Sequence, residues 1–227
     1  MRLFTLLTMI LLITSCSRNR HLTGDYMKYA NSHRTVAVLP YDITIIGKDA
    51  RELTPDQLDL VILEESELFQ QSLYSEVLKR TGRRDKDIQI SVLDIRRTNR
   101  LLDDAGIDGL NIGEYSANEI GKILSVDAVV TTRLIKEGFL NRETAMIADV
   151  LSTSVLDKID LPISILANRR KLTRASKVDI YAYIVDTDSD KAVWQYNTEC
   201  DLDWELEPSE VIESINGSIS KNFPYRK

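Results

Sequence analysis

The chain has 227 residues, 43% of them hydrophobic, and a formal net charge of −6 at pH 7. This composition is typical of a folded globular protein and excludes a disordered chain. The acidic balance argues against nucleic acid as a partner, because phosphate binding requires a basic surface. The length suits one domain.

The N-terminus has the pattern of a secretory signal. Arg2 supplies a positive start, and residues 3–13 are mostly apolar. This run is too short to cross a membrane, which takes about 20 residues. Ile13, Ser15 and Cys16 then resemble the lipobox of bacterial lipoproteins. The resemblance implies a signal peptide over residues 1–15 and acylation of Cys16 by palmitate-like chains. An ordinary cleaved signal peptide is the alternative.

Acylation at Cys16 predicts a protein of the cell envelope that is held to membrane lipid. Ser17 rather than an acidic residue follows the cysteine, and by resemblance to lipoprotein sorting this favours the outer membrane, facing the periplasm. Residues 16–33 are polar and have no clear period, so we predict a lipidated tether there, with a short helix or turn near residues 25–30. The folded domain is expected over residues 34–227.

The first half of this domain alternates strands and helices. Residues 35–39 are a continuous apolar run, typical of a strand buried on both faces. Thr54 and Gln57 form a capping box at the start of a long amphipathic helix. The chain then predicts a strand over 88–95, a short helix over 96–105, a loop over 106–113, a helix that begins with the capping box of Ser116 and Glu119, and a strand over 126–134.

An excursion over residues 139–175 interrupts this alternation. Residues 145–159 have a helical pattern, and a basic cluster follows in an otherwise acidic protein. A solvated loop is one interpretation of the cluster; contact with anionic headgroups or an acidic partner is the other. The cluster consists of Arg169, Arg170, Lys171 and Arg174.

Residues 178–185 and 192–203 predict a β-hairpin, and Pro208 begins a last helix. In the second strand Trp194, Tyr196 and Cys200 lie on the face expected to be buried. Gln195, Asn197 and Glu199 lie on the other, solvated face. The predicted fold class is α/β: a single three-layer domain with a mixed sheet, in the order β-α-β-α-β, then an antiparallel hairpin and a C-terminal α-helix.

No cluster in the sequence has the spacing of a metal or cofactor site. Asp186, Asp188 and Asp190 begin like a calcium loop, but Lys191 stands where glycine is needed. We expect these three carboxylates to be solvated at the hairpin tip.

No catalytic constellation is visible either. The only histidines, His21 and His33, lie in or beside the predicted tether, which argues against a triad or a zinc site. We expect the pair Glu64 and Glu65 to be ordinary solvated charges. The sequence therefore predicts no enzyme, no cofactor and no metal.

Three segments resemble a known superfamily: Thr-Val-Ala-Val-Leu-Pro at 35–40, Glu-Ile-Gly-Lys-Ile-Leu-Ser-Val-Asp-Ala-Val-Val at 119–130, and Val-Asp-Thr-Asp-Ser-Asp-Lys-Ala-Val-Trp at 185–194. They are similar to the curli-secretion lipoprotein, the penicillin-binding-protein activator lipoprotein B and the TolB amino-terminal domain. The resemblance spans residues 34–222 and implies a protein that works by assembling or by contacting a partner. Asp190 and Ser125 stand where these proteins have glycine, and the basic excursion argues against a curli-type pore.

Two functions follow from these predictions. The first is a non-enzymatic, membrane-anchored periplasmic lipoprotein that acts as an adaptor or activator by binding another envelope protein. The alternative is an oligomeric subunit of an envelope secretion or transport assembly; a hydrolase with an unrecognised site is more remote. The candidate partner-binding residues are Arg169, Arg170, Lys171, Arg174, Gln195, Asn197 and Glu199.

Overall fold

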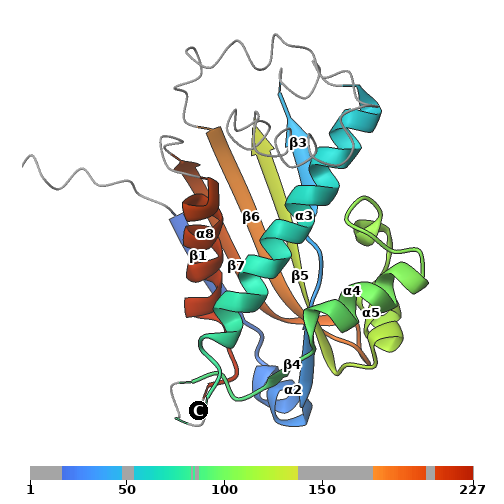
Figure 1. Cartoon of the computed structure of the whole chain (residues 1–227). Coiled ribbons are helices and arrows are strands. Elements are labelled where there is room, and N and C mark those ends of the chain that lie inside the picture. The colour runs from blue at the N-terminus through green and yellow to red at the C-terminus, as the bar shows by residue number, and fades with distance from the viewer. Residues whose placement is uncertain are drawn as a thin grey trace, which may run out of the picture.

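A computed structural model describes residues 17–47, 54–82, 84, 87–137, 176–202 and 208–226. The described part contains a seven-stranded mixed sheet in the order β1-β7-β6-β5-β2-β4, with β3 paired to β5 (Figure 1). This confirms the predicted mixed α/β fold. The predicted signal peptide, Cys16 and the excursion over 139–175 lie outside the described residues.

From β2 onward the main helices and strands follow the predicted order. The strands are β1 (Ser17–Leu22), β2 (Thr35–Val38), β3 (Asp42–Ile46), β4 (Ser91–Val92), β5 (Ala128–Glu137), β6 (Ser176–Asp186) and β7 (Lys191–Leu202). The helices are α2 (Tyr26–Ser32), α3 (Pro55–Leu78), α4 (Ile95–Asp104), the 3-10 helix η3 (Ile112–Glu114), α5 (Ala117–Leu124) and α8 (Pro208–Asn222).

The sheet combines a parallel part and an antiparallel part. β2 pairs in parallel with both β4 and β5, as the crossovers predict, whereas β5, β6 and β7 form an antiparallel meander. β2 and β3 lie one after the other along β5. Pro40, which has no N–H to donate to a ladder, lies between them.

The predicted strand over 88–95 is much shorter than expected, because only Ser91 and Val92 form β4. The residues before them bond elsewhere: the Ile88 N–H donates to the Arg80 carbonyl, and the Gln89 N–H donates to the Tyr225 carbonyl. The backbone of these residues therefore makes hydrogen bonds with the end of α3 and with the C-terminal tail, and not with a neighbouring strand.

Both predicted capping boxes are confirmed. The Thr54 hydroxyl accepts from the Gln57 N–H, and the Gln57 side chain accepts from the Thr54 N–H, at the start of α3. Ser116 and Glu119 make the same reciprocal pair at the start of α5. Ser125, at the end of α5, has a left-handed φ of 54°. Glycine adopts this backbone conformation with the smallest steric penalty.

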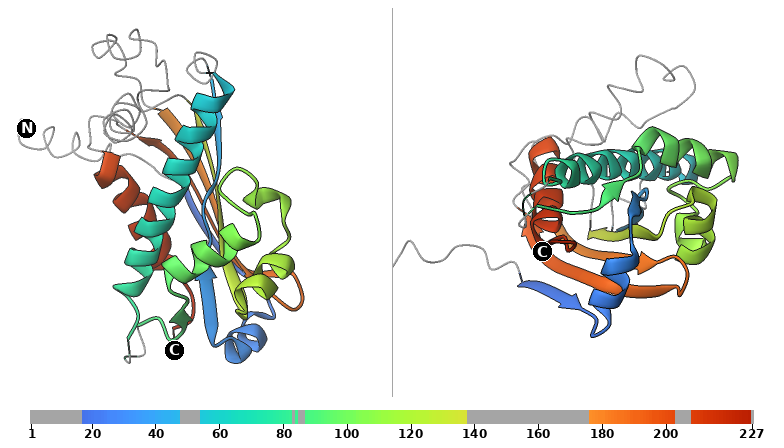
Figure 2. Two further views of the ribbon diagram at one scale, coloured as in Figure 1. Left: turned by 45° about the vertical axis from the view of Figure 1, so that its right-hand side comes forward. Right: turned by 90° about the horizontal axis from the view of Figure 1, so that it is seen from below.

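Helices lie on both faces of the sheet, but they cover them unequally (Figure 2). α3 and α8 pack across one face, where Phe69, Leu73 and Ile215 join the main core. On the opposite face, α4 and α5 cover only the region of β2 and the start of β5, through Leu102 and Leu124. The rest of that face carries no helix among the described residues.

Residues 17–33 differ from the expected tether. β1 pairs antiparallel with β7 over all six of its residues, and α2 follows with Tyr26 buried. His33 is buried as well. An edge strand is held by backbone hydrogen bonds, so it needs no alternating apolar pattern of its own. This explains why the polar sequence did not predict it.

Candidate functional site

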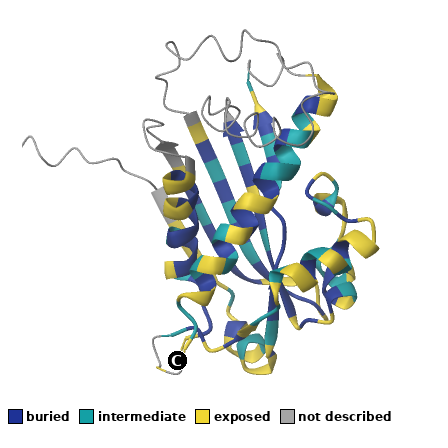
Figure 3. Cartoon of the chain, viewed as in Figure 1, coloured by how far each residue is buried: buried dark blue, intermediate teal, exposed yellow. Residues whose placement is uncertain are grey.

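The part of the sheet that α4 and α5 leave uncovered is named here the open face. Val178 to Val185 alternate between buried and half-buried, so one side of β6 faces the core and the other faces outward (Figure 3). The neighbouring strands follow the same alternation in register. The open face consists of Asn19, His21, Asp42, Thr44, Thr131, Arg133, Tyr181, Tyr183, Gln195, Asn197 and Glu199.

The register brings five strands together in one row across the open face. Asp42, Arg133, Tyr181, Asn197 and Asn19 are successive Cα partners from β3 to β1. Arg133 Nε lies 3.6 Å from Asp42 Oδ2, so this part of the row is close to neutral. Tyrosines and amides supply contact area together with hydrogen-bond donors and acceptors. Such a mixture suits a protein partner.

A groove lies where the open face meets α5 and η3. Its volume is about 390 Å³, within the range of ligand sites. The groove is lined by apolar residues, Leu39, Ile112, Ile120, Val129 and Val185, and by polar or aromatic residues, Asp42, Tyr115, Thr131, Arg133, Tyr183 and Asp190. An apolar group bordered by polar groups therefore matches this site.

Close packing fixes the wall of the groove. A Cβ atom on Gly113 would lie 3.2 Å from Asp42 Oδ2, so the η3 loop approaches β3 closely because glycine stands there. On the other side, Asn118 donates its backbone N–H to Asp190 Oδ1 at 3.1 Å and its side-chain amide to the Thr187 carbonyl at 2.6 Å. These contacts hold α5 against the β6–β7 turn, so the groove is preformed.

The hairpin acids are not all solvated as expected. Asp188 and Asp190 are exposed, but Asp186 is buried. Its Oδ1 lies 2.8 Å from His33 Nε2, and its Oδ2 accepts from the backbone N–H and the hydroxyl of Ser189. Asp190 has a left-handed φ of 54°, which aspartate tolerates better than most residues.

His33 links three distant parts of the chain in a buried network. Its Nδ1 lies 2.6 Å from the Tyr225 hydroxyl, and the Tyr225 N–H donates to the Tyr26 hydroxyl at 2.6 Å. Burial raises the pKa of Tyr225, so this phenol stays protonated. Neither cavity described in this section includes His33. The network therefore ties α2 and the residue that follows it to the hairpin and the C-terminal tail.

The carboxylate of Asp186 makes stability depend on pH. Burial acts to raise the pKa of Asp186, but hydrogen bonds from Ser189 and His33 outweigh it and hold that pKa below its ordinary value. A carboxylate with a depressed folded-state pKa stabilises fully above the unfolded-state pKa of about 3.9. This contribution is lost as the pH falls through the lower folded-state pKa.

We expect Asp186→Asn to lower the free energy of unfolding at pH 7 by about 1–3 kcal/mol, because it weakens a charged hydrogen-bond network. Below pH 4 the difference from the parent should shrink. Urea denaturation at both pH values measures it. Asp188→Asn, at the exposed tip of the same hairpin, is the matched control and should change little. Equal stability of the two variants at pH 7 would contradict the assignment.

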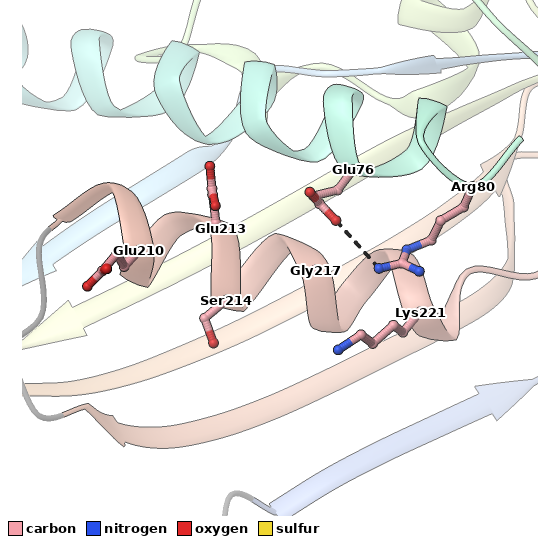
Figure 4. A pocket seen from close by; sticks show the side chains of 7 residues that line it. All are labelled: Glu76, Arg80, Glu210, Glu213, Ser214, Gly217 and Lys221. Carbon is pink, nitrogen blue, oxygen red and sulfur yellow. Dashed lines mark ion pairs between the residues drawn. The ribbon is translucent and has the colours of Figure 1, made fainter.

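A second cavity, of about 490 Å³, lies between α3 and α8 (Figure 4). Two of its charged residues are paired within the fold: Glu76 pairs with Arg80 and with Lys79, and Arg80 Nε donates to the Ser220 hydroxyl at 2.8 Å. The hydrogen bond from Arg80 to Ser220 joins the end of α3 to α8. The cavity is thus a charged seam between helices, and the groove by the open face is the better candidate site.

Some predicted site residues are placed and others are not. Gln195, Asn197 and Glu199 lie on the open face, as the alternation predicts. Cys16 and the basic residues Arg169, Arg170, Lys171 and Arg174 lie outside the described residues. Sequence reasoning missed Arg133, Tyr181 and Tyr183. Alternation within their strands was visible, but only the register shows that they share one face with β7.

Metal-binding clusters and membrane-spanning helices are both absent from the described residues. In that part of the chain no group of three or more His, Cys, Asp or Glu side chains could hold a metal ion. No helix among the same residues is long and apolar enough to cross a membrane.

Comparison with known proteins gives only weak likenesses. No family model matches the chain, and no curated protein matches its sequence. Among solved structures, the PelC dodecamer from Paraburkholderia phytofirmans has a TM-score of 0.43 and 8% identity, over 94% of this chain and 99% of that one. Lipoprotein GNA1162 from Neisseria meningitidis has a TM-score of 0.42 and 10% identity, over 82% and 92%.

A PDZ domain protein from Parabacteroides distasonis is also similar, with a TM-score of 0.40 and 13% identity. The match covers 100% of this chain and 40% of that protein. Likenesses at this level say nothing of what this chain binds. The resemblance to the curli-secretion and TolB superfamily stays a prediction.

Proposed function

We propose that this chain is a non-enzymatic, lipid-anchored envelope protein, facing the periplasm from the outer membrane, that acts as an adaptor or activator by binding another envelope protein. The observation that carries the proposal is the open face beside a preformed groove. Tyr183 lines the groove beside its apolar floor, and Tyr181 lies two residues before it on the same face; both are half-buried. Aromatic anchors around a pocket are typical of the energetic centre of a protein interface.

The chemistry of the site indicates the kind of segment it binds. The apolar floor suits an aliphatic or aromatic side chain of the partner, while the amides of Gln195 and Asn197 suit its backbone. The ion pair of Asp42 and Arg133 lies at the edge of the groove with its arginine exposed. Charged groups at a rim favour orientation more than affinity.

The basic cluster Arg169, Arg170, Lys171 and Arg174 belongs to the same proposal. The excursion leaves the sheet after Glu137 and returns at Ser176, and the register places both beside the end of β7 that pairs with Ser17. We propose the cluster as a second contact for the partner.

An oligomeric subunit of a secretion or transport assembly is the second candidate, and one observation favours it. β1 ends the strand order of the sheet, and Asn19 to Leu22 are exposed. Within the described residues no strand pairs with its outer edge. An open edge of this kind is a template for pairing with another chain, including a second copy.

The native mass of the detergent-extracted protein, with its co-purifying chains identified, tests the proposal. We expect one different protein at a constant ratio. In Tyr183→Ala the recovery of that protein should fall by at least about tenfold, because an aromatic anchor next to a pocket is removed. A large homo-oligomer without other chains would favour the assembly subunit instead.

The matched control is Gln71→Ala, an exposed residue of α3 on the opposite side of the sheet. It should recover the partner like the parent protein. Thermal unfolding shows whether Tyr183→Ala is still folded. Full recovery of the partner by folded Tyr183→Ala would exclude the open face as the binding surface.

A further inference from the structure

The first strand begins immediately after the predicted lipid attachment site. β1 starts at Ser17, one residue after Cys16. All of its residues pair with β7 in unbroken register, from Ser17 with Glu199 to Leu22 with Trp194. Consecutive Cα atoms are 3.8 Å apart. An acyl group on Cys16 is thus attached almost directly to the sheet.

β1 is fastened to the domain well beyond its own ladder. The Thr23 N–H and hydroxyl both donate to the Val193 carbonyl at 3.3 Å. Tyr26 is buried and accepts from the Tyr225 N–H, and His33 is buried in its network with Asp186 and Tyr225. Releasing β1 requires breaking its ladder with β7, and α2 remains fixed to the domain behind it by these buried side chains.

We infer that the anchor holds the domain directly against the lipid surface, with the Ser17 end of the sheet nearest the headgroups. This inference rests on the proposed acylation of Cys16. The same end of the sheet contains Lys177 and the last residues of β5. This follows from the register, in which Lys136 pairs with Val178 and Val178 pairs with Cys200. β1 leads about 20 Å away from it, at 3.2–3.4 Å per residue, to α2 and the hairpin turn.

The inference limits the reach of the protein. α3 has 24 residues and is about 36 Å long, which sets the scale of the domain. The groove lies along the first half of β5, at Val129 to Arg133, which is the half farther from the Ser17 end of the sheet. The groove thus opens parallel to the membrane surface, at a short and fixed distance from the lipid headgroups. The partner has to lie in the same membrane or extend down to it, because no tether carries the domain across the periplasm.

Energy transfer to the bilayer measures the orientation. The mature acylated protein, in a Cys200→Ser background, receives a donor dye at Lys177→Cys or at Met27→Cys, both exposed. It is reconstituted into vesicles of phosphatidylethanolamine and phosphatidylglycerol with an acceptor on the lipid headgroups. We expect the dye at position 177 to be nearer the acceptors by about 20 Å, the length of β1. Equal transfer from the two positions would overturn the inference.

A linker variant supplies the matched control. About ten Gly and Ser residues, beginning with Ser, are inserted between Cys16 and Ser17; such a linker spans roughly 17 Å on average. It keeps the residue after the cysteine unchanged but frees the domain, so transfer should fall at position 177 and become similar at both positions. Unchanged transfer in the linker variant would also overturn the inference.

The mass of the N-terminal peptide separates this inference from the proposal it rests on. A non-acylated Cys16, or a Cys16→Ala variant that still fractionates with membranes, would overturn both the lipid anchor and the orientation. Equal transfer from an acylated protein would overturn the orientation alone.

Discussion

Lys136→Met is expected to lower the free energy of unfolding by about 3–5 kcal/mol, the cost of breaking a buried ion pair by removing one partner. Lys136 of β5 and Glu65 of α3 lie 2.5 Å apart, and their side chains are 3% and 2% exposed. Glu65 Oε2 has no hydrogen-bond partner among the described residues. Without Lys136 its carboxylate would be left buried and uncompensated.

A double variant distinguishes the pair from the packing around it. Glu65→Leu together with Lys136→Met replaces both charges by apolar groups, and such replacements are often neutral or stabilising. We expect the double variant to recover most of the loss in urea denaturation. Glu64→Gln, at the next position of α3 and only half-buried, should cost less than about 0.5 kcal/mol. A loss below about 1 kcal/mol in Lys136→Met would contradict the role of the pair.

Trp194→Ala is expected to cost about 3–5 kcal/mol of unfolding free energy, as large-to-small changes of buried aromatic residues do. Trp194 is 1% exposed. It stacks on Tyr196 with ring centroids 6.2 Å apart and meets Phe223 at 5.8 Å. Its indole Nε1 has no partner among the described residues, so packing supplies its contribution to stability.

The adjacent residue of β7 provides the control. Gln195→Ala changes the opposite face of the same strand and should alter stability by less than about 0.5 kcal/mol. Trp194→Phe should cost less than Trp194→Ala, because an aromatic ring remains in the core. Urea denaturation followed by circular dichroism measures all three variants. A small loss in Trp194→Ala would show that β7 is held by its backbone ladder instead of by this face.

Local patterns predicted much of the architecture. Thr54 with Gln57 and Ser116 with Glu119 begin helices as expected, because a capping box involves only neighbouring residues. The alternation of Trp194 and Tyr196 with Gln195 and Asn197 separates the buried side of β7 from the open face. Strand periodicity is a property of the strand itself, so it survives without knowledge of its neighbours.

The solvent exposure of two carboxylates, Glu65 and Asp186, was predicted wrongly. Glu65 was expected in solvent, yet Lys136, 71 positions away, meets it in the interior. Asp186 was expected to be solvated and His33 to lie in or beside the tether, but they meet across 153 positions and are buried together. A charged residue on an amphipathic segment carries no mark of the partner that folding brings to it.

The sequence by itself thus determined the element order, the helix starts, the mixed sheet and the inward side of its hairpin. These depend on spacings of a few residues. The tertiary structure decided that residues 17–33 belong to the domain, that five strands place Asp42, Arg133, Tyr181, Asn197 and Asn19 in one row, and that a groove lies beside them. Those features depend on register and on contacts between distant segments, which backbone pairing creates without a local signature.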